Sequence, residues 1–135
     1  MNVWTLHPQL AADTHAVHSL PLSDVRLMDD AQYPWLILVP RVAGASELTD
    51  LDGTAQAALL AEIDRACRAL QRLYAPHKLN VAALGNVVPQ LHVHVIARFR
   101  DDPAWPRPVW GAVPARPYEA AALAATLQRL RDALA

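Results

Sequence analysis

Residues 90–96 read QLHVHVI, which places two histidines, His92 and His94, one valine apart in an apolar run. Because valine and isoleucine favour extended backbone, this run predicts a β-strand, which we place at residues 91–99. Successive side chains of a strand point to opposite faces. Gln90, His92 and His94 should therefore share one face, and the aliphatic residues between them should face the core.

The remaining elements are predicted from the spacing of apolar residues. Short extended runs predict four further strands, at residues 14–20, 24–28, 35–40 and 79–85. Apolar residues recur at steps of three and four over residues 49–74 and again near 117–134, which predicts two helices.

The ends of the two helices are also expected from single residues. Thr49 followed by Asp52 suits a capped start of the long helix, and Pro117 suits the first turn of the second helix. Strands that are grouped in sequence, instead of alternating with helices, indicate an α+β fold with an antiparallel sheet.

The length of 135 residues and an apolar content of 53% predict one domain, residues 1–135. The segment DDPAWPRPVWGAVPARP, residues 101–117, contains five prolines and two tryptophans. Proline excludes a regular helix or a central strand, so we expect an ordered loop. The tryptophans, Trp105 and Trp110, should pack on the site or on a partner.

Charge and hydropathy exclude several classes of partner. The formal net charge is −1, and like charges do not form a block, so a nucleic acid polymer is not an expected partner. The sequence has neither a signal-like start nor 18 consecutive apolar residues. We therefore expect a cytoplasmic protein that does not bind a membrane.

The histidine pair allows three interpretations from the residues alone. The first is an exposed strand face with no function. The second is a His-x-His metal site, for which the sequence offers no clear third ligand. In the third, one histidine attacks phosphorus through one ring nitrogen while the other nitrogen keeps its proton against a carbonyl. The second histidine would then donate to phosphate oxygens.

The longer stretch GNVVPQLHVHVIAR, residues 85–98, resembles the signature of the histidine triad (HIT) family, and WLILVPR followed by a long helix extends the likeness. The resemblance implies a HIT-like fold with a five-stranded, mostly antiparallel sheet, a long helix and a C-terminal helix. It implies that His92 attacks the α-phosphorus of a nucleoside 5′-phosphoryl conjugate to form a nucleotidyl-histidine intermediate. The conjugate would be a dinucleoside polyphosphate or a nucleoside phosphoramidate. A nucleotide-binding module with little turnover is the alternative.

The sequence departs from the usual family pattern at three positions. Gln90 stands where the first triad histidine is usual, as in the bacterial Gln-x-His-x-His subgroup that resembles diadenosine polyphosphate hydrolases. Gln90 and His94 would hold phosphate oxygens, and His94 would assist the leaving group. Trp35 replaces a histidine, and Val87 replaces a hydroxyl residue. The support behind the triad and the leaving-group contacts should therefore differ.

The resemblance also implies a set of binding residues and partners. Asp29, or its neighbour Asp30, would bind the ribose hydroxyls, and Asn80, Gly85 and Asn86 would lie near the phosphate. No cofactor is required, although Mg²⁺ can accompany a nucleotide substrate, and no protein metal site is assigned. A homodimer whose two sheets join is expected.

Overall fold

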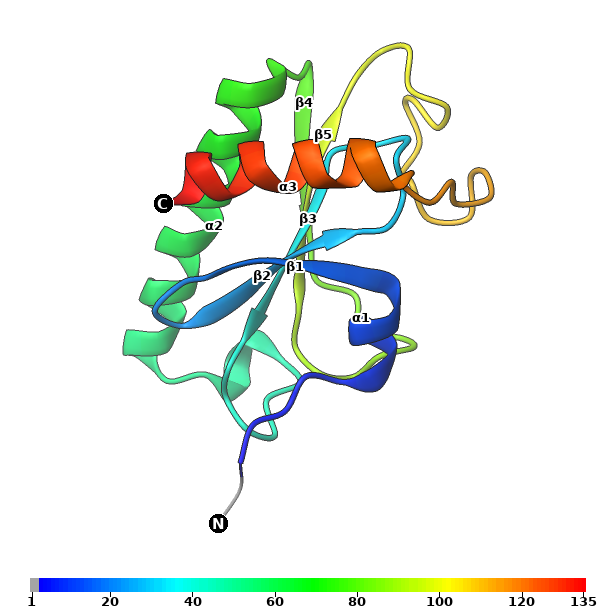
Figure 1. Ribbon diagram of the computed structural model, residues 1–135. Helices are drawn as coiled ribbons and strands as arrows, with labels where there is room; N and C mark the ends of the chain where they lie inside the picture. The colour runs from blue at the N-terminus through cyan, green and yellow to red at the C-terminus, as the bar shows by residue number, and fades with distance from the viewer. Residues whose placement is uncertain (1–2) are drawn as a thin grey trace.

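The computed structural model describes residues 3–135 and confirms the α+β fold with a five-stranded antiparallel sheet. The elements in chain order are α1 (Pro8–Asp13), β1 (Thr14–Ser19), β2 (Ser23–Met28), β3 (Trp35–Pro40), the 3₁₀ turn η1 (Leu48–Asp50), α2 (Gly53–Tyr74), β4 (Lys78–Ala82), β5 (Val93–Arg98) and α3 (Ala120–Leu134). The strand order is β1-β2-β3-β5-β4, as Figure 1 shows.

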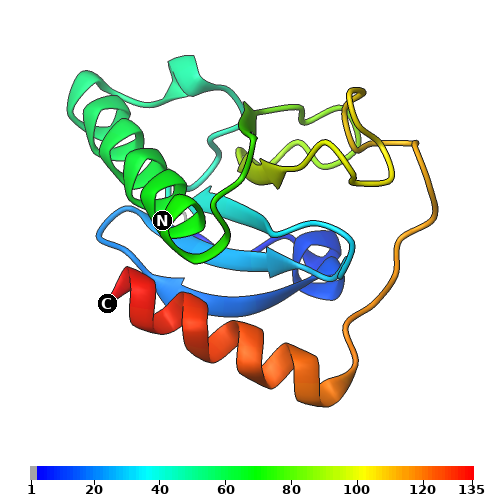
Figure 2. The ribbon, with the colours of Figure 1, turned by 90° about the horizontal axis from the view of Figure 1, so that it is seen from above.

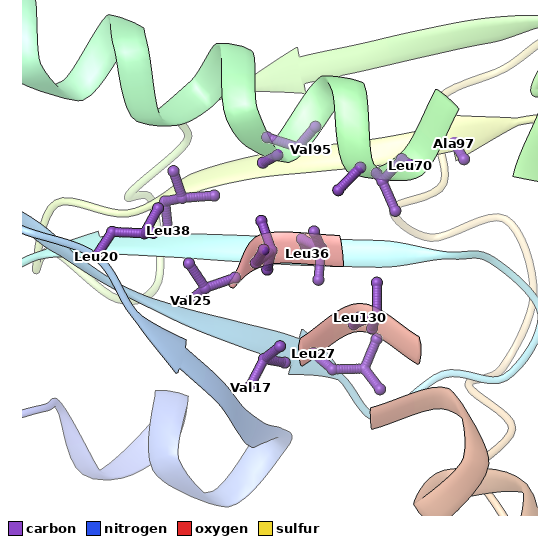
Figure 3. Packing of buried hydrophobic residues seen from close by; sticks show 13 residues of the cluster. Val17, Leu20, Val25, Leu27, Leu36, Leu38, Leu70, Val95, Ala97 and Leu130 are labelled. Atoms are coloured by element: carbon purple, nitrogen blue, oxygen red, sulfur yellow. The ribbon is translucent and has the colours of Figure 1, made fainter. Parts of the chain in front are cut away.

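The long helix α2 and the C-terminal helix α3 cover the same face of the sheet (Figure 2). Aliphatic side chains from both helices and from four strands form the main core between these layers (Figure 3). Val95 and Ala97 of β5 belong to this core, as the alternation of the strand predicts. None of the helices within residues 3–135 is long and apolar enough to cross a membrane.

The opposite face of the sheet carries the histidines. His94 pairs with Ile37 of β3, and Ile37 belongs to a second core that includes Trp35 and Ile96. This second core is covered by Leu10 of α1 and by Val109 of the Pro-rich loop instead of by the long helices. This face of the sheet therefore lies under the short helix α1 and the Pro-rich loop.

Several predicted boundaries were wrong. Helix α2 begins after Asp52, whose carboxylate accepts from Ala55 N, whereas Thr49 lies in the separate turn η1. Helix α3 begins at Ala120 instead of near residue 117: Tyr118 N donates to Asp29, and the cap residue Glu119 is extended. The six-residue helix α1 was not predicted.

The strand that carries the histidines is shorter than predicted. β5 begins at Val93, so Gln90 and His92 lie in the turn before it, and β4 ends at Ala82 instead of residue 85. In the segment between these strands, Gly85 adopts φ +79°, a conformation that favours glycine.

The far end of β5 is held by a buried ion pair. The side chains of Arg98 and Asp102 are 1% and 3% exposed, and Arg98 Nε lies 2.8 Å from Asp102 Oδ2. Arg98 also donates to Asn80 Oδ1 and to the carbonyl of Arg107. Asp102 also accepts from three backbone N–H groups, those of Phe99, Ala104 and Trp105. This pair fixes the start of the Pro-rich loop, which runs back over the histidine face.

Candidate active site

His92 is held with one ring nitrogen protonated and the other free. Its Nδ1 lies 2.6 Å from the carbonyl oxygen of Gln90. Because a carbonyl only accepts hydrogen bonds, Nδ1 carries the proton and Nε2 keeps its lone pair. His92 is 7% exposed and lines a cleft of about 180 Å³ together with Gly85 and the turn that precedes α2. This is the arrangement predicted for a histidine nucleophile.

His94 is held in the opposite sense. Trp35 Nε1 donates to His94 Nδ1 across 3.0 Å, so the remaining nitrogen, Nε2, carries the proton in the neutral ring. The centroids of the His92 and His94 rings are 5.0 Å apart. Burial, and to a lesser extent the neighbouring His92, lowers the pKa of His94 to about 4. His94 therefore presents a hydrogen-bond donor, Nε2–H, beside the ring of His92, whose Nε2 carries a lone pair.

The Pro-rich loop packs over its own site. The ring of Trp110 lies 5.0 Å from that of His94 and 5.7 Å from that of Trp35, in both cases edge to face. Trp105 instead packs against His77 and beneath the Arg98 guanidinium. Of the two tryptophans, Trp110 is thus the one that covers the candidate site.

Gln90 joins the site to the N-terminal segment. Its Oε1 accepts from His7 N, and its Nε2 donates to Thr5 O, each across 2.8 Å. The amide oxygen and one N–H are therefore engaged, and the second N–H of Nε2 remains available to a phosphate oxygen. The predicted contact of Gln90 with phosphate stays a prediction, while its tie to residues 5–7 was not predicted.

Gln90→Ala should release the N-terminal segment without unfolding the domain. The change removes both hydrogen bonds, so the amide of His7 should exchange with solvent at least about tenfold faster, a loss of roughly 1–2 kcal/mol of local protection. Hydrogen exchange followed by NMR measures this rate. Gln90→Glu is the matched control, since it keeps the acceptor for His7 N and loses the donor to Thr5. An unchanged exchange rate of the His7 amide in Gln90→Ala would show that Gln90 does not hold the N-terminal segment in place.

A second cleft, of about 370 Å³, lies beside Trp35 and Trp110. Its lining includes Met28, Asp29 and Asp30. Asp30 is buried and accepts from Gln32 and from Arg116 N, so the more exposed Asp29 is better placed to meet a ligand.

The Asp29 carboxylate is stabilised in its charged form. Tyr118 N donates to Oδ1 across 3.0 Å, and His15 Nε2 lies 3.1 Å from the same oxygen. Desolvation raises the pKa of Asp29, but the hydrogen bond from Tyr118 N and the close contact with His15 outweigh this effect, and the pKa lies below its ordinary value. An ionised Asp29 can accept hydrogen bonds from vicinal hydroxyls, as predicted for a ribose contact.

The other predicted binding residues occupy different surroundings. Gly85 lines the smaller cleft with His92, and Asn86 is exposed on the same turn. Asn80 pairs with Ile96 in the sheet, and its Oδ1 is taken by Arg98. Contacts of these three residues with a substrate stay predictions. Of the two residues that precede Asp29 in the sequence, Leu27 is fully buried in the main core, whereas Met28 lines the larger cleft.

Metal binding through the histidine pair would need a third ligand. Within residues 3–135, the structure places no group of three or more His, Cys, Asp or Glu side chains where they could hold a metal ion.

Comparisons with known proteins identify the family of this chain. The family model described as HIT domain matches residues 9–101, so the chain belongs to the histidine triad (HIT) family. A histidine triad protein from Bradyrhizobium japonicum is similar at 49% identity and a TM-score of 0.96, over 98% of this chain and 99% of that chain. Comparison with curated proteins gave no match.

Two further solved structures of histidine triad proteins are similar over almost the whole chain. The protein from Marinobacter aquaeolei is 46% identical, with a TM-score of 0.95, over 98% of this chain and 96% of that one. The protein from Sinorhizobium meliloti is 40% identical, with a TM-score of 0.94, over 97% of each chain.

Proposed function

We propose that the protein is a nucleotide hydrolase or transferase that cleaves at the α-phosphorus of a nucleoside 5′-phosphoryl conjugate. The observation that carries this proposal is the complementary protonation of the two histidines. His92 presents a lone pair on Nε2 because Nδ1 is held by the Gln90 carbonyl. His94 presents a proton on Nε2 because Nδ1 is held by Trp35. A nucleophile next to a hydrogen-bond donor is what attack on a phosphoryl group requires.

The reaction proceeds in two displacements. His92 Nε2 attacks phosphorus, the bond from phosphorus to the leaving atom breaks, and the leaving group takes a proton from water. His94 Nε2–H donates to a phosphoryl oxygen and stabilises the charge that develops there. Water then attacks phosphorus, releases His92 and gives up one proton to solvent, which yields the nucleoside monophosphate. In a transferase another nucleophile replaces this water.

The larger cleft suits the nucleoside, with Asp29 on the ribose hydroxyls and Trp110 and Met28 against the base. The phosphoryl group then lies between His92 and His94, near the turn that contains Gly85 and Asn86. The residues themselves require no cofactor, and Mg²⁺ would enter with a polyphosphate substrate. The proposed location is the cytoplasm.

The charges of the two clefts favour one class of conjugate. Neither lining includes a lysine or an arginine from the described part of the chain, whereas Glu47 lines the smaller cleft and three aspartates, Asp13, Asp29 and Asp30, line the larger one. A polyphosphate chain would bring several negative charges without a cation to meet them. A phosphoramidate brings only one such charge and releases an amine. We therefore favour a nucleoside phosphoramidate over a dinucleoside polyphosphate.

The test compares adenosine and guanosine phosphoramidates with diadenosine tetraphosphate, with and without Mg²⁺, and identifies products by mass spectrometry. We expect nucleoside monophosphate from the phosphoramidates and a protein adduct of one nucleotidyl group after rapid quenching. Faster cleavage of the tetraphosphate would overturn the choice of conjugate. Binding without products or adduct would instead support the nucleotide-binding module.

We also propose a homodimer joined through the β4 edge. Val81 on β4 and Leu84 beyond it are each 49% exposed, and Leu60 of α2 is 68% exposed. An apolar edge strand is a surface that other chains pair with. Light scattering should give twice the chain mass of 14.8 kDa, and Val81→Lys should shift it toward the monomer. Val113→Lys, on the Pro-rich loop, is the control. A wild-type mass near that of one chain would contradict the dimer.

A further inference from the structure

We propose that Trp35 is a positioning residue that holds His94 as a neutral donor, with its proton on Nε2, and prevents the ring from becoming a cation. The proposal rests on the proposed function, because it specifies how His94 would serve the phosphoryl group. It assigns a chemical role to the tryptophan that this chain carries at the start of β3.

The geometry leaves His94 one protonation state. Trp35 and His94 are 6% and 4% exposed, and the indole nitrogen lies 3.0 Å from Nδ1. Indole nitrogen has a proton to donate and no lone pair to accept with. A proton on His94 Nδ1 would therefore face another N–H group in a buried site, at the cost of the hydrogen bond. This disfavours both the imidazolium and the Nδ1–H tautomer.

The other neighbours of His94 act in the same direction. Trp110 covers the ring, and His92 is the titratable group beside it. Within residues 3–135 no carboxylate is paired with the His94 ring, so no ion pair favours its charged form. Burial and His92 hold the pKa of His94 at about 4, in agreement with the hydrogen bond from Trp35.

This state decides what His94 contributes. A neutral ring lends one hydrogen bond from Nε2 and no charge, and it does so at any pH above about 5. A histidine at position 35 could either donate or accept and would tolerate a charged His94. Trp35 thus stands where a histidine could switch between donor and acceptor, and its indole N–H can only donate.

The experiment is ¹⁵N NMR of histidine-labelled protein, with long-range ¹H–¹⁵N correlations recorded from pH 5 to pH 8. In the wild type, His94 should show unprotonated Nδ1 and protonated Nε2 throughout. In Trp35→Phe, both tautomers should appear, and the pKa should rise by about one unit or more toward the ordinary value of 6.5.

Trp110→Phe is the matched control. It also removes an indole from the His94 ring, but the structure shows no hydrogen bond from Trp110 Nε1 to His94 among the described contacts. The single tautomer should therefore survive in this variant. Trp35→His is a second test, because it restores a partner that can accept and should allow His94 to titrate.

Two results would overturn the proposal: a proton on His94 Nδ1 in the wild type, or a Trp35→Phe spectrum that keeps the wild-type tautomer and pKa. The wild-type spectrum and Trp35→His decide the matter if Trp35→Phe does not fold. The NMR results need no turnover, so an inactive wild type with the expected tautomer would refute the proposed function alone.

Discussion

His92→Ala should abolish cleavage of a nucleoside conjugate, with a loss of at least about 10⁴-fold in kcat, or roughly 5 kcal/mol of barrier. The reason is that Nε2 of His92 is the lone pair that the site presents, while His94 presents a proton. Catalysis through a covalent intermediate cannot proceed without the attacking atom. Single-turnover assays with the phosphoramidate measure the loss, and intact-protein mass spectrometry should show no adduct.

Two further variants separate chemistry from folding. His18→Ala removes a histidine from β1, away from both clefts, and should stay within about twofold of the wild type. His92→Gly should recover part of its activity when free imidazole is added, since the small ligand can supply the missing nitrogen. Turnover of His92→Ala within a few-fold of the wild type would remove His92 from the mechanism.

Asp102→Ala should lower the free energy of unfolding by about 3–5 kcal/mol, the usual effect of removing one partner from a buried ion pair. The Arg98 guanidinium, 1% exposed, would keep its charge and lose the carboxylate that faces Nε and Nη2. Three backbone N–H groups at the start of the Pro-rich loop would lose their acceptor as well. Urea denaturation followed by tryptophan fluorescence measures the change.

Asp64→Ala provides a matched control for Asp102→Ala. Arg68 and Asp64 also form an ion pair at four-residue spacing, with the same 2.8 Å between nitrogen and oxygen, but their side chains are 70% and 57% exposed. Solvent screening makes such pairs weak, so no measurable loss is expected. Equal losses in the two variants would show that burial of Arg98 is not what makes its ion pair important.

The buried pair of Arg98 and Asp102 also predicts a dependence of stability on pH. Desolvation raises the pKa of Asp102, but hydrogen bonds from Arg98 and from the backbone outweigh it, and the pKa lies below its ordinary value of 3.8. A lowered folded-state pKa stabilises the fold above the unfolded-state value, and this stabilisation is lost as the pH falls through the folded value. Acid should therefore destabilise the wild type more steeply below about pH 4 than it destabilises Asp102→Ala.

The fold was largely predictable because its signals are local. The QLHVHVI run, the other extended runs and the two apolar helical patterns each fall on a real element. Helix α1 was missed because six residues are too few to show a helical repeat. The start of α3 was misplaced because the contact that delays it joins Tyr118 to Asp29, 89 residues earlier.

The site was predictable only in part, because some of its contacts join residues that are distant in the sequence. His92 was singled out from its motif, and its Nδ1 is held by the carbonyl of Gln90, two residues away. The partner of His94 is Trp35, 59 residues away, and the partners of Gln90 are 83 and 85 residues away. Such contacts depend on tertiary packing, which no spacing in the sequence records.

Strand β5 is anchored at both of its ends. Before it, Gln90 is bound to residues 5–7, and at its last residue Arg98 is bound to Asp102 and to the Arg107 carbonyl. The alignment of the two imidazoles is therefore a property of the folded chain and does not wait for a ligand. Residues that line the larger cleft, such as Met28 and Val113, can consequently change without disturbing this alignment.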